Sequence, residues 1–207
     1  MIIVLFGPPG SGKGTQAERI AAVTGTPHVS TGAILRDEVA RNTELGREAS
    51  PIMESGALVP DDLMVRIIEH RLAEPDAQPG VILDGFPRTV PQAEALDRML
   101  RRNGREVSVV IYLDVAPEMV RERILRRAAV DGRGDDTAEA FTERMRVYTR
   151  ETAPVVDHYA AAGVRVERVD GAPAIDEVTG RILSLLEGGR GGGAEAGRAA
   201  VSGDRSQ

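Results

Sequence analysis

A glycine-rich loop with one lysine lies between a short apolar run and a helical segment near the start of the chain. The apolar run is residues 2–6, IIVLF, and the loop is residues 7–15, GPPGSGKGT. A short run rich in β-branched residues is typical of a buried parallel strand. Glycines let backbone N–H groups turn towards an anion, and the next helix points the positive end of its dipole there. This order predicts a phosphate-binding loop in an α/β fold.

Lys13 is the only lysine among 26 basic residues, and all the others are arginine. A compact ammonium on a flexible stem can reach the outer phosphates of a nucleotide held by the loop. Gly14 follows the lysine, where most loops of this type carry Ser or Thr as a Mg²⁺ ligand, and Thr15 comes one place later. A GTPase switch needs that direct ligand, so the loop favours another branch of nucleotide-binding proteins.

Apolar runs alternate with helical patterns along the chain. We expect strands at 2–6, 27–29, 81–84, 107–114 and 164–170. We expect helices at 13–24, 33–42, 47–55, 61–73, 91–102, 117–128, 137–161 and 174–187, the seventh bent near Pro154. Alternation of this kind predicts a doubly wound, five-stranded parallel sheet with helices on both faces.

Composition excludes several kinds of protein. The absence of cysteine excludes a disulfide framework, a thiolate zinc site, a Cys nucleophile and an iron–sulfur cluster. A net charge of −6 argues against a nucleic-acid or membrane-surface binder. No apolar run approaches the ~20 residues of a membrane span, and the first residues lack the basic region of a signal peptide. We therefore expect a cytoplasmic protein with neither nucleic acid nor membrane as partner.

Two further features concern a metal and the end of the chain. Asp84 ends the apolar run 81–84, and a carboxylate at the carboxyl end of a parallel strand can orient Mg²⁺ and its waters. We predict that Asp84 holds Mg²⁺ through water, although an aspartate that caps the next turn would explain the same position. Residues 188–207 are rich in glycine and poor in large apolar side chains, which predicts a disordered tail.

The chain resembles the adenylate kinase family in six segments that occur in the family's order and at its spacing. They are GPPGSGKGTQ (7–16), STGAILR (30–36), SGALVPDDL (55–63), LDGFPRTVPQAEAL (83–96), GRGDDT (132–137) and ERMRVYTRETAPV (143–155). DGFPRT followed by PQ is highly specific. The resemblance implies reversible phosphoryl transfer from ATP–Mg²⁺ to AMP, giving two ADP. It also implies one domain at 1–187, with an AMP-binding insert at 30–59 and a short lid at 128–136.

The resemblance also implies the residues that bind the donor. They are Gly10, Ser11, Gly12, Lys13, Gly14, Thr15, Arg123, Arg127 and Pro173. Arg123 and Arg127 share a helix face because they lie four residues apart. Long-lid members of the family carry a small extra domain between the positions of Arg127 and Arg133, sometimes with four metal-binding residues. Only five residues separate them here, so we expect Mg²⁺ but no zinc.

For the acceptor, the resemblance implies an adenine site at Thr31 and Gln92 and a phosphate site at Arg36 and Arg88. The full implied set is Thr31, Arg36, Ala57, Leu58, Val59, Gly85, Phe86, Pro87, Arg88, Gln92, Arg133 and Arg144. Phosphoryl transfer depends on alignment and on fixed positive charge at the transferring group. The residues predicted to be catalytic are accordingly Lys13, Arg88, Arg133 and Arg144.

Three alternatives remain at this stage. A UMP/CMP kinase would share the loop and DGFPR, although Thr31 and Gln92 favour adenine. A nucleotide-binding switch protein would need an Asn-Lys-x-Asp motif, and Lys13 is the only lysine. A nucleotide-dependent scaffold protein would be distinguished from an enzyme only by its lack of turnover. The expected protein is a monomeric enzyme with ATP and AMP as its small-molecule partners.

Overall fold

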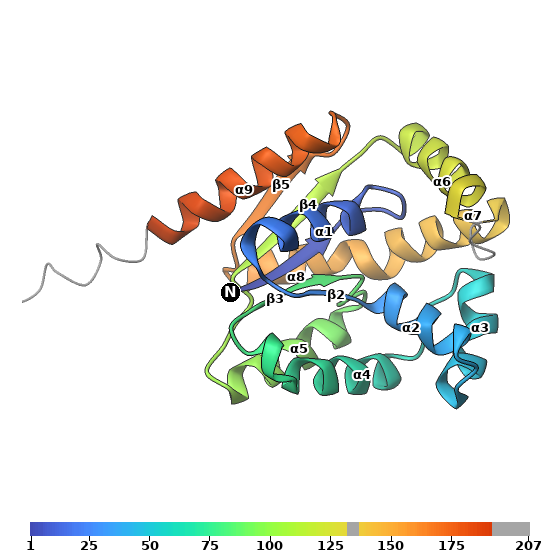
Figure 1. Ribbon diagram of the computed structural model, residues 1–207, viewed down its shortest axis with the longest axis horizontal. Helices are drawn as coiled ribbons and strands as arrows, with labels where there is room; N and C mark the ends of the chain where they lie inside the picture. Colours follow the sequence, from blue (N-terminus) through green and yellow to red (C-terminus); the bar gives the residue numbers. More distant parts are fainter. Residues whose placement is uncertain (132–136, 192–207) are drawn as a thin grey trace, which may run out of the picture.

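The computed structural model describes residues 1–131 and 137–191, and for 127–131 and 189–191 it describes the backbone alone. A five-stranded parallel sheet forms the centre of the molecule (Figure 1). Its strands are β1 (Ile2–Phe6), β2 (His28–Ser30), β3 (Val81–Asp84), β4 (Val109–Asp114) and β5 (Val166–Asp170). The strand order is β2-β3-β1-β4-β5. The predicted fold class is confirmed.

Helices cover both faces of this sheet (Figure 1). They are α1 (Lys13–Thr24), α2 (Thr31–Ala40), α3 (Glu44–Ser55), α4 (Asp61–Ala73), α5 (Val90–Arg102), α6 (Pro117–Asp131), α7 (Ala138–Val147), α8 (Ala153–Ala161) and α9 (Ile175–Gly191). Among these described residues, no helix combines the length and apolarity needed to cross a membrane.

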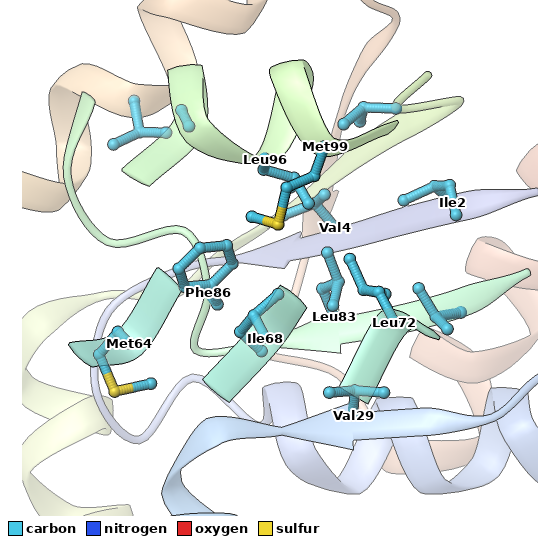
Figure 2. Close-up of a cluster of buried hydrophobic side chains, with 14 of the residues drawn as sticks. Ile2, Val4, Val29, Met64, Ile68, Leu72, Leu83, Phe86, Leu96 and Met99 are labelled. Carbon is cyan, nitrogen blue, oxygen red and sulfur yellow. The ribbon is translucent and has the colours of Figure 1, made fainter. Parts of the chain in front are cut away.

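Alternation along β1 divides the core into two layers. Val4 and Phe6 pack with α4, α5 and α8 on one face, and Ile3 and Leu5 pack with α1 and α9 on the other. Side chains of successive strand residues point to opposite faces, so one apolar strand supplies both layers. Figure 2 shows the first layer, where Leu83 lies among side chains of α4 and α5.

The strands end together at one edge of the sheet. Leu5 of β1 pairs with Asp84 of β3, and Ser30 of β2 pairs with the same aspartate. Because the strands are parallel, the segments that follow them emerge side by side. The glycine-rich loop, the start of α2 and the segment after Asp84 therefore lie close together, as in other doubly wound sheets.

Several element boundaries differ from the sequence predictions, each for a local reason. Helix α3 begins at Glu44 because the Thr43 side chain accepts a hydrogen bond from the Gly46 N–H at 3.0 Å. The expected helix 137–161 contains a π-helical turn, η2 (Tyr148–Thr152), which ends two residues before Pro154. Proline has no N–H for an ordinary helical bond, so the regular helical pattern is interrupted near the position where a bend was expected. Helix α6 extends to Asp131 and α9 to Gly191.

A short 3-10 helix, η1 (Pro75–Ala77), was not expected from the sequence. The predicted tail at 188–207 overlaps the last turn of α9, and its residues 192–207 lie outside the described residues.

Candidate active site

A cavity of about 1040 Å³ opens at the carboxyl edge of the sheet. Its walls come from the glycine-rich loop, α2, the turn after α3, the segment after β3, α6, α7 and the segment after β5. Residues distant in the sequence therefore face one space large enough for more than one small ligand.

The glycine-rich loop is shaped by its backbone. Gly10 has φ +82°, and a Cβ there would lie 2.7 Å from Cγ1 of Ile124 on α6. Any other residue would meet both backbone strain and this contact. Gly12 precedes α1 and also has a left-handed conformation. The first turn of α1 consequently directs its N–H groups into the cavity, as an anion site requires.

The Lys13 side chain folds back onto the backbone of the glycine-rich loop. Its Nζ donates hydrogen bonds to the carbonyl oxygens of Gly7 at 2.8 Å and Pro8 at 2.9 Å. These bonds hold the half-buried ammonium in the cavity at the amino end of α1. The group adds a full positive charge to a site already favourable to anions.

Asp84 presents one carboxylate beside the loop. Its Oδ2 lies 3.6 Å from Nε2 of His28, and a Cβ on Gly14 would lie 3.5 Å from the same oxygen. Burial would raise the pKa of Asp84, but His28 and the positive charges of Lys13 and Arg88 outweigh it and lower the pKa below its ordinary value. The carboxylate is therefore ionised at neutral pH.

Three arginines gather on the other side of the cavity. Arg88 donates from Nε to the carbonyl oxygen of Gly85 at 2.8 Å. Burial lowers the pKa of Arg88, and the charges of Arg144 and Arg36 lower it further, against the opposing effect of Asp84. Since a guanidinium stays charged in proteins, its lowered pKa marks a site that favours a bound anion.

Gly85 holds Thr31 and Arg88 together. Its carbonyl oxygen accepts hydrogen bonds from Thr31 Oγ1 at 2.9 Å and from Arg88 Nε. Its φ is +81°, and a Cβ there would lie 2.6 Å from Thr31 Oγ1. Ser30, rather than Thr31, caps α2 by accepting a bond from the Ala33 N–H. Thr31 is thereby left to face the cavity.

Gln92 is buried and lines the cavity. Its Oε1 accepts from the backbone N–H of Arg88 at 2.8 Å, and its Nε2 donates to Oδ1 of Asp61 at 2.7 Å. A side-chain amide has two N–H donors and two acceptor lone pairs, so one of each remains.

The segment after β5 meets the glycine-rich loop through Arg123 of α6. Its guanidinium donates to the carbonyl oxygens of Gly171 at 2.9 Å and Ser11 at 3.4 Å. Pro173 lines the cavity, and the neighbouring Ile175 is 48% exposed. An arginine bridge and an exposed apolar side chain together form a wall suited to a flat ligand.

The family model for adenylate kinase matches residues 5–164. An adenylate kinase of Stenotrophomonas maltophilia is 49% identical over 187 residues, covering 90% of this chain and 100% of the relative. One from Thermus thermophilus is 50% identical over 184 residues, covering 89% and 96% respectively. The chain belongs to the adenylate kinase family. The predicted resemblance and enzyme class are confirmed: it is a nucleotide-binding phosphotransferase, and none of the alternatives is favoured.

Most of the adenylate kinase site residues predicted from the sequence line this one cavity. They are Gly10, Ser11, Gly12, Lys13, Gly14, Thr15, Thr31, Arg36, Ala57, Leu58, Val59, Asp84, Gly85, Pro87, Arg88, Gln92, Arg123, Arg144 and Pro173.

Three predicted residues are not among them. Phe86 is 1% exposed and packs with Met64 and Ile68 of α4, because its apolar ring gains more in the core than in a polar cavity (Figure 2). The Phe86 side chain therefore lies in the core, and its place in the AMP site stays a prediction. Arg127 lies on α6, where only the backbone is described, and Arg133 lies outside the described residues.

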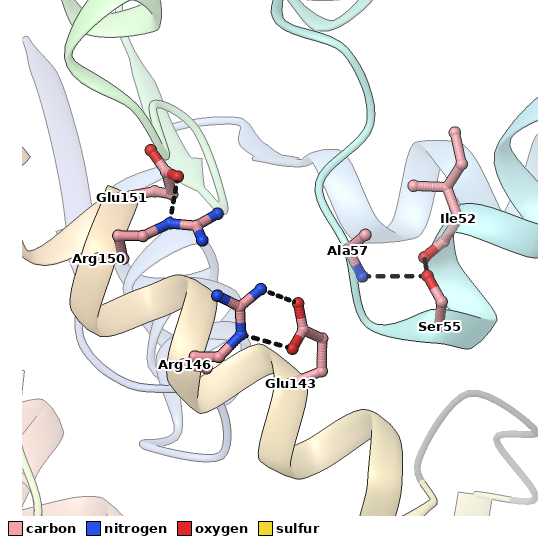
Figure 3. A network of polar contacts seen from close by, with 7 residues as sticks. All are labelled: Ile52, Ser55, Ala57, Glu143, Arg146, Arg150 and Glu151. Atoms are coloured by element: carbon pink, nitrogen blue, oxygen red, sulfur yellow. Dashed lines mark hydrogen bonds and ion pairs between the residues drawn. The ribbon is translucent and has the colours of Figure 1, made fainter.

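The predicted AMP-binding insert contains α2 and α3 and touches α7. Figure 3 shows the turn from Ser55 to Ala57 facing α7. A Cβ on Gly56 would lie 2.6 Å from the Ala140 carbonyl oxygen and 3.3 Å from Cγ of Arg144. Ion pairs lie along α7 and η2, Arg146 with Glu143 among them (Figure 3). The insert thus approaches the helix that carries Arg144.

Sequence reasoning missed several residues that hold the site in place. Thr152 of η2 donates from Oγ1 to the Arg88 carbonyl oxygen at 2.9 Å. Tyr148 donates from its hydroxyl to that of Tyr112 at 3.1 Å. Asp61 was recognised only as a helix start, and His28 only as part of a strand. Their polar identity was the one available signal, since their partners lie far away in the sequence.

Proposed function

We propose that the chain transfers the γ-phosphoryl group of ATP–Mg²⁺ reversibly to AMP and produces two ADP. One observation carries the proposal: the phosphate loop with Lys13 and the cluster of Arg36, Arg88 and Arg144 face the same cavity. A loop of backbone N–H groups suits the polyphosphate of a donor. A group of guanidinium side chains suits the phosphate of an acceptor.

In this reaction an oxygen of the AMP phosphate attacks the γ-phosphorus of ATP. A new P–O bond forms there, while the bond to the oxygen that bridges the β- and γ-phosphates breaks and its electron pair leaves with ADP. The acceptor phosphate is already ionised, so no general base is required. Lys13 and the arginines align the phosphates and stabilise the charge on the transferring group.

For the donor we propose that residues 10–15 bind the phosphates and that Arg123, Arg127 and Pro173 adjoin the base. Arg123 already connects the loop to the segment after β5 through Ser11 and Gly171. The lid at 128–136, with Arg133, is proposed to exclude water, which would otherwise compete as acceptor.

For the acceptor we propose that Thr31 and Gln92 meet the adenine and that Arg36, Arg88, Arg133 and Arg144 meet the phosphate. The backbone of 57–59 and of 85–87 completes the pocket. Thr31 and Gln92 are both linked to Arg88 through hydrogen bonds. Thr31 and the Arg88 side chain donate to the same Gly85 carbonyl oxygen, and Gln92 accepts from the Arg88 backbone N–H. Base and phosphate contacts are thus joined through Arg88.

Magnesium fits the donor side through Asp84. Mg²⁺ in nucleotide sites is commonly held by one or two carboxylates together with phosphate oxygens and water. Asp84 supplies an ionised carboxylate, and Gly14 leaves space beside it. Among the described residues no group of three or more His, Asp or Glu could hold a metal by itself. When bound, Mg²⁺ neutralises charge on the phosphates.

A coupled assay tests the function, with ATP–Mg²⁺ and each of AMP, CMP, UMP and GMP as acceptor. We expect the highest kcat/KM with AMP. A preference for CMP or UMP would instead indicate a UMP/CMP kinase. No turnover with any acceptor would exclude nucleoside monophosphate kinase activity. Removal of Mg²⁺ should abolish activity and its return restore it, whereas zinc-selective chelation should change neither activity nor melting temperature.

We further propose that the enzyme works as a monomer in the cytoplasm. The cavity contains both proposed nucleotide sites within one chain. Light scattering at assay concentration should therefore give the mass of a single chain, with and without nucleotides.

A further inference from the structure

Asp61 joins two helices beneath the proposed adenine site. It is the first residue of α4, and α4 lies beside α5 (Figure 1). One carboxylate oxygen, Oδ1, accepts from Gln92 Nε2 at 2.7 Å, and the other, Oδ2, accepts from Thr89 Oγ1 at 2.8 Å. The position at the amino end of α4 further favours the negative charge. Both partners of Asp61 lie at the start of α5.

These contacts determine which way round the Gln92 amide lies. A carboxylate only accepts hydrogen bonds, so the group facing Asp61 has to be the NH₂. The backbone N–H of Arg88 only donates, so the group facing it has to be the carbonyl oxygen. A turned amide would place oxygen against oxygen at Asp61 and N–H against N–H at Arg88. Two independent partners thus enforce a single orientation.

The orientation matters because a free amide could serve two kinds of purine. Adenine offers an amino donor beside a ring-nitrogen acceptor. Hypoxanthine and guanine offer an oxo acceptor beside an N–H donor, which is the reverse pattern. A glutamine that could turn would pair with either. A glutamine whose remaining lone pair and N–H are fixed in position pairs with adenine. With hypoxanthine or guanine it meets an acceptor with its lone pair and a donor with its N–H.

We propose that Asp61 is a positioning residue that makes the acceptor site selective for 6-aminopurine over 6-oxopurine nucleotides. It acts through Gln92, and the inference rests on the proposed function, in which Gln92 meets the acceptor base. The arginines hold the phosphate, which prevents the base from shifting to suit a mismatched edge. Asp61 therefore contributes specificity without touching the nucleotide.

The test is Asp61→Asn, which keeps the shape of the side chain but adds a donor. An asparagine can donate to a turned Gln92, so only the Arg88 N–H still opposes the turn. The matched control is Asp62→Asn, the same change at the exposed neighbouring position of α4. The quantity measured is the ratio of kcat/KM for AMP to kcat/KM for inosine monophosphate, at saturating ATP–Mg²⁺.

We expect the ratio to fall about tenfold in Asp61→Asn, the effect of one hydrogen bond to a charged group. It should stay within twofold of wild type in Asp62→Asn. Removing a negative charge strengthens binding of both anionic nucleotides alike, so the ratio is insensitive to it. An unchanged ratio in Asp61→Asn, even with a lower melting temperature or weaker AMP binding, would overturn the inference and leave Asp61 a structural residue.

Thr89→Val provides a second variant should Asp61→Asn unfold. It removes the hydroxyl that donates to Oδ2 of Asp61 and accepts from the Gln92 backbone N–H, and it leaves the charge of Asp61 in place. The ratio should fall in the same direction, by a smaller factor of about threefold. No change here would also contradict the inference. Failure of the proposed function looks different, because the wild-type enzyme would then fail to phosphorylate AMP in preference to CMP and UMP.

Discussion

The proposed donor and acceptor sides of the cavity are built from different kinds of groups. The donor side is mainly backbone, with N–H groups at the start of α1 arranged by Gly10 and Gly12. The acceptor side is mainly side chains from α2, α5 and α7, and further residues hold them in place. Gly85, Asp61 and Thr152 each accept from or donate to one of the acceptor-side residues.

This difference has a physical consequence. Backbone N–H groups recognise the charge of a polyphosphate but carry no information about a base. Side-chain amides and hydroxyls can distinguish one base from another, provided that their orientation is fixed. A substitution on the donor side should therefore affect catalysis with every acceptor. A substitution on the acceptor side should change which acceptor is used, or how well it binds.

The largest expected effect is that of Lys13→Met on the donor side. Loss of a charge at the transferring phosphoryl group should cost at least ~3 kcal/mol, or about a hundredfold in kcat, with AMP and with any slower acceptor. Steady-state kinetics with both substrates varied will measure it. Arg19→Met, an exposed cation on the same helix, is the control and should stay within twofold. Turnover of Lys13→Met within tenfold of wild type would contradict the assignment.

Arg88→Met should separate activity from stability on the acceptor side. Loss of charge-assisted hydrogen bonds worth ~1.5–3 kcal/mol should lower kcat/KM for AMP roughly ten- to 150-fold, with KM for ATP unchanged. Because burial and neighbouring cations lower the pKa of Arg88, folding disfavours its charge in the nucleotide-free protein. The free energy of unfolding should therefore fall by no more than about 1 kcal/mol, despite the lost bond to Gly85.

Denaturant melts without nucleotide measure this second quantity. Arg98→Met is the control, since Arg98 is an exposed cation on α5 whose carboxylate neighbour, Glu94, is also exposed. A large loss of stability in Arg88→Met, but not in the control, would show that the Arg88 cation stabilises the fold and is not reserved for binding an anion.

Gln92→Leu should raise the KM for AMP about five- to fifty-fold and leave the KM for ATP nearly unchanged, since one or more hydrogen bonds to the base are lost. The structure adds a second effect, because Asp61 Oδ1 and the Arg88 N–H both lose their partner. An unsatisfied buried group costs ~1–3 kcal/mol, so the melting temperature should fall too.

The matched control is Gln78→Leu, which removes a glutamine whose amide donates to the Leu72 carbonyl oxygen at the far end of α4. It should leave the KM for AMP unchanged. If Gln92→Leu also left that constant unchanged, the adenine site would have to lie elsewhere.

The same comparison explains what could be predicted from the sequence. The donor loop is contiguous, so residues 7–15 display both its geometry and its charge. Helix α4 and strand β3 were predicted with their observed bounds, because Pro60 marks the start of the helix and the strand is a short apolar run. The π-helical turn before Pro154 was predicted only as a bend, since proline forbids an ordinary bond without specifying what replaces it.

The supports of the acceptor side could not be predicted, because they depend on packing between distant segments. Gln92 lines the cavity, but its partner Asp61 lies 31 residues away in the sequence, and Thr152 lies 64 residues from Arg88. Phe86 shows a limit of motif-based prediction. The motif around it is specific to the family, but a motif does not reveal which of its members turns into the core.

The smallest expected effect concerns the end of the chain, behind the donor side. Helix α9 supports α1 there, because Gln16 donates from Nε2 to the Ile175 carbonyl oxygen at 3.1 Å and Leu186 is buried. Deleting residues 192–207 leaves these contacts intact. The composition of the deleted residues offers little apolar surface to bury. We expect the free energy of unfolding to change by less than ~0.5 kcal/mol and the KM for ATP to stay within twofold.

Deleting residues 184–207 is the matched comparison. It removes Leu186 from the core, at a cost of roughly 1.5–3 kcal/mol, and weakens the support of α1. The KM for ATP should then rise while the KM for AMP changes less, because the lost contacts lie behind the phosphate loop. Thermal melts and kinetics on both truncations decide the matter: a clearly lower melting temperature after loss of 192–207 alone would mean that this segment docks on the folded domain.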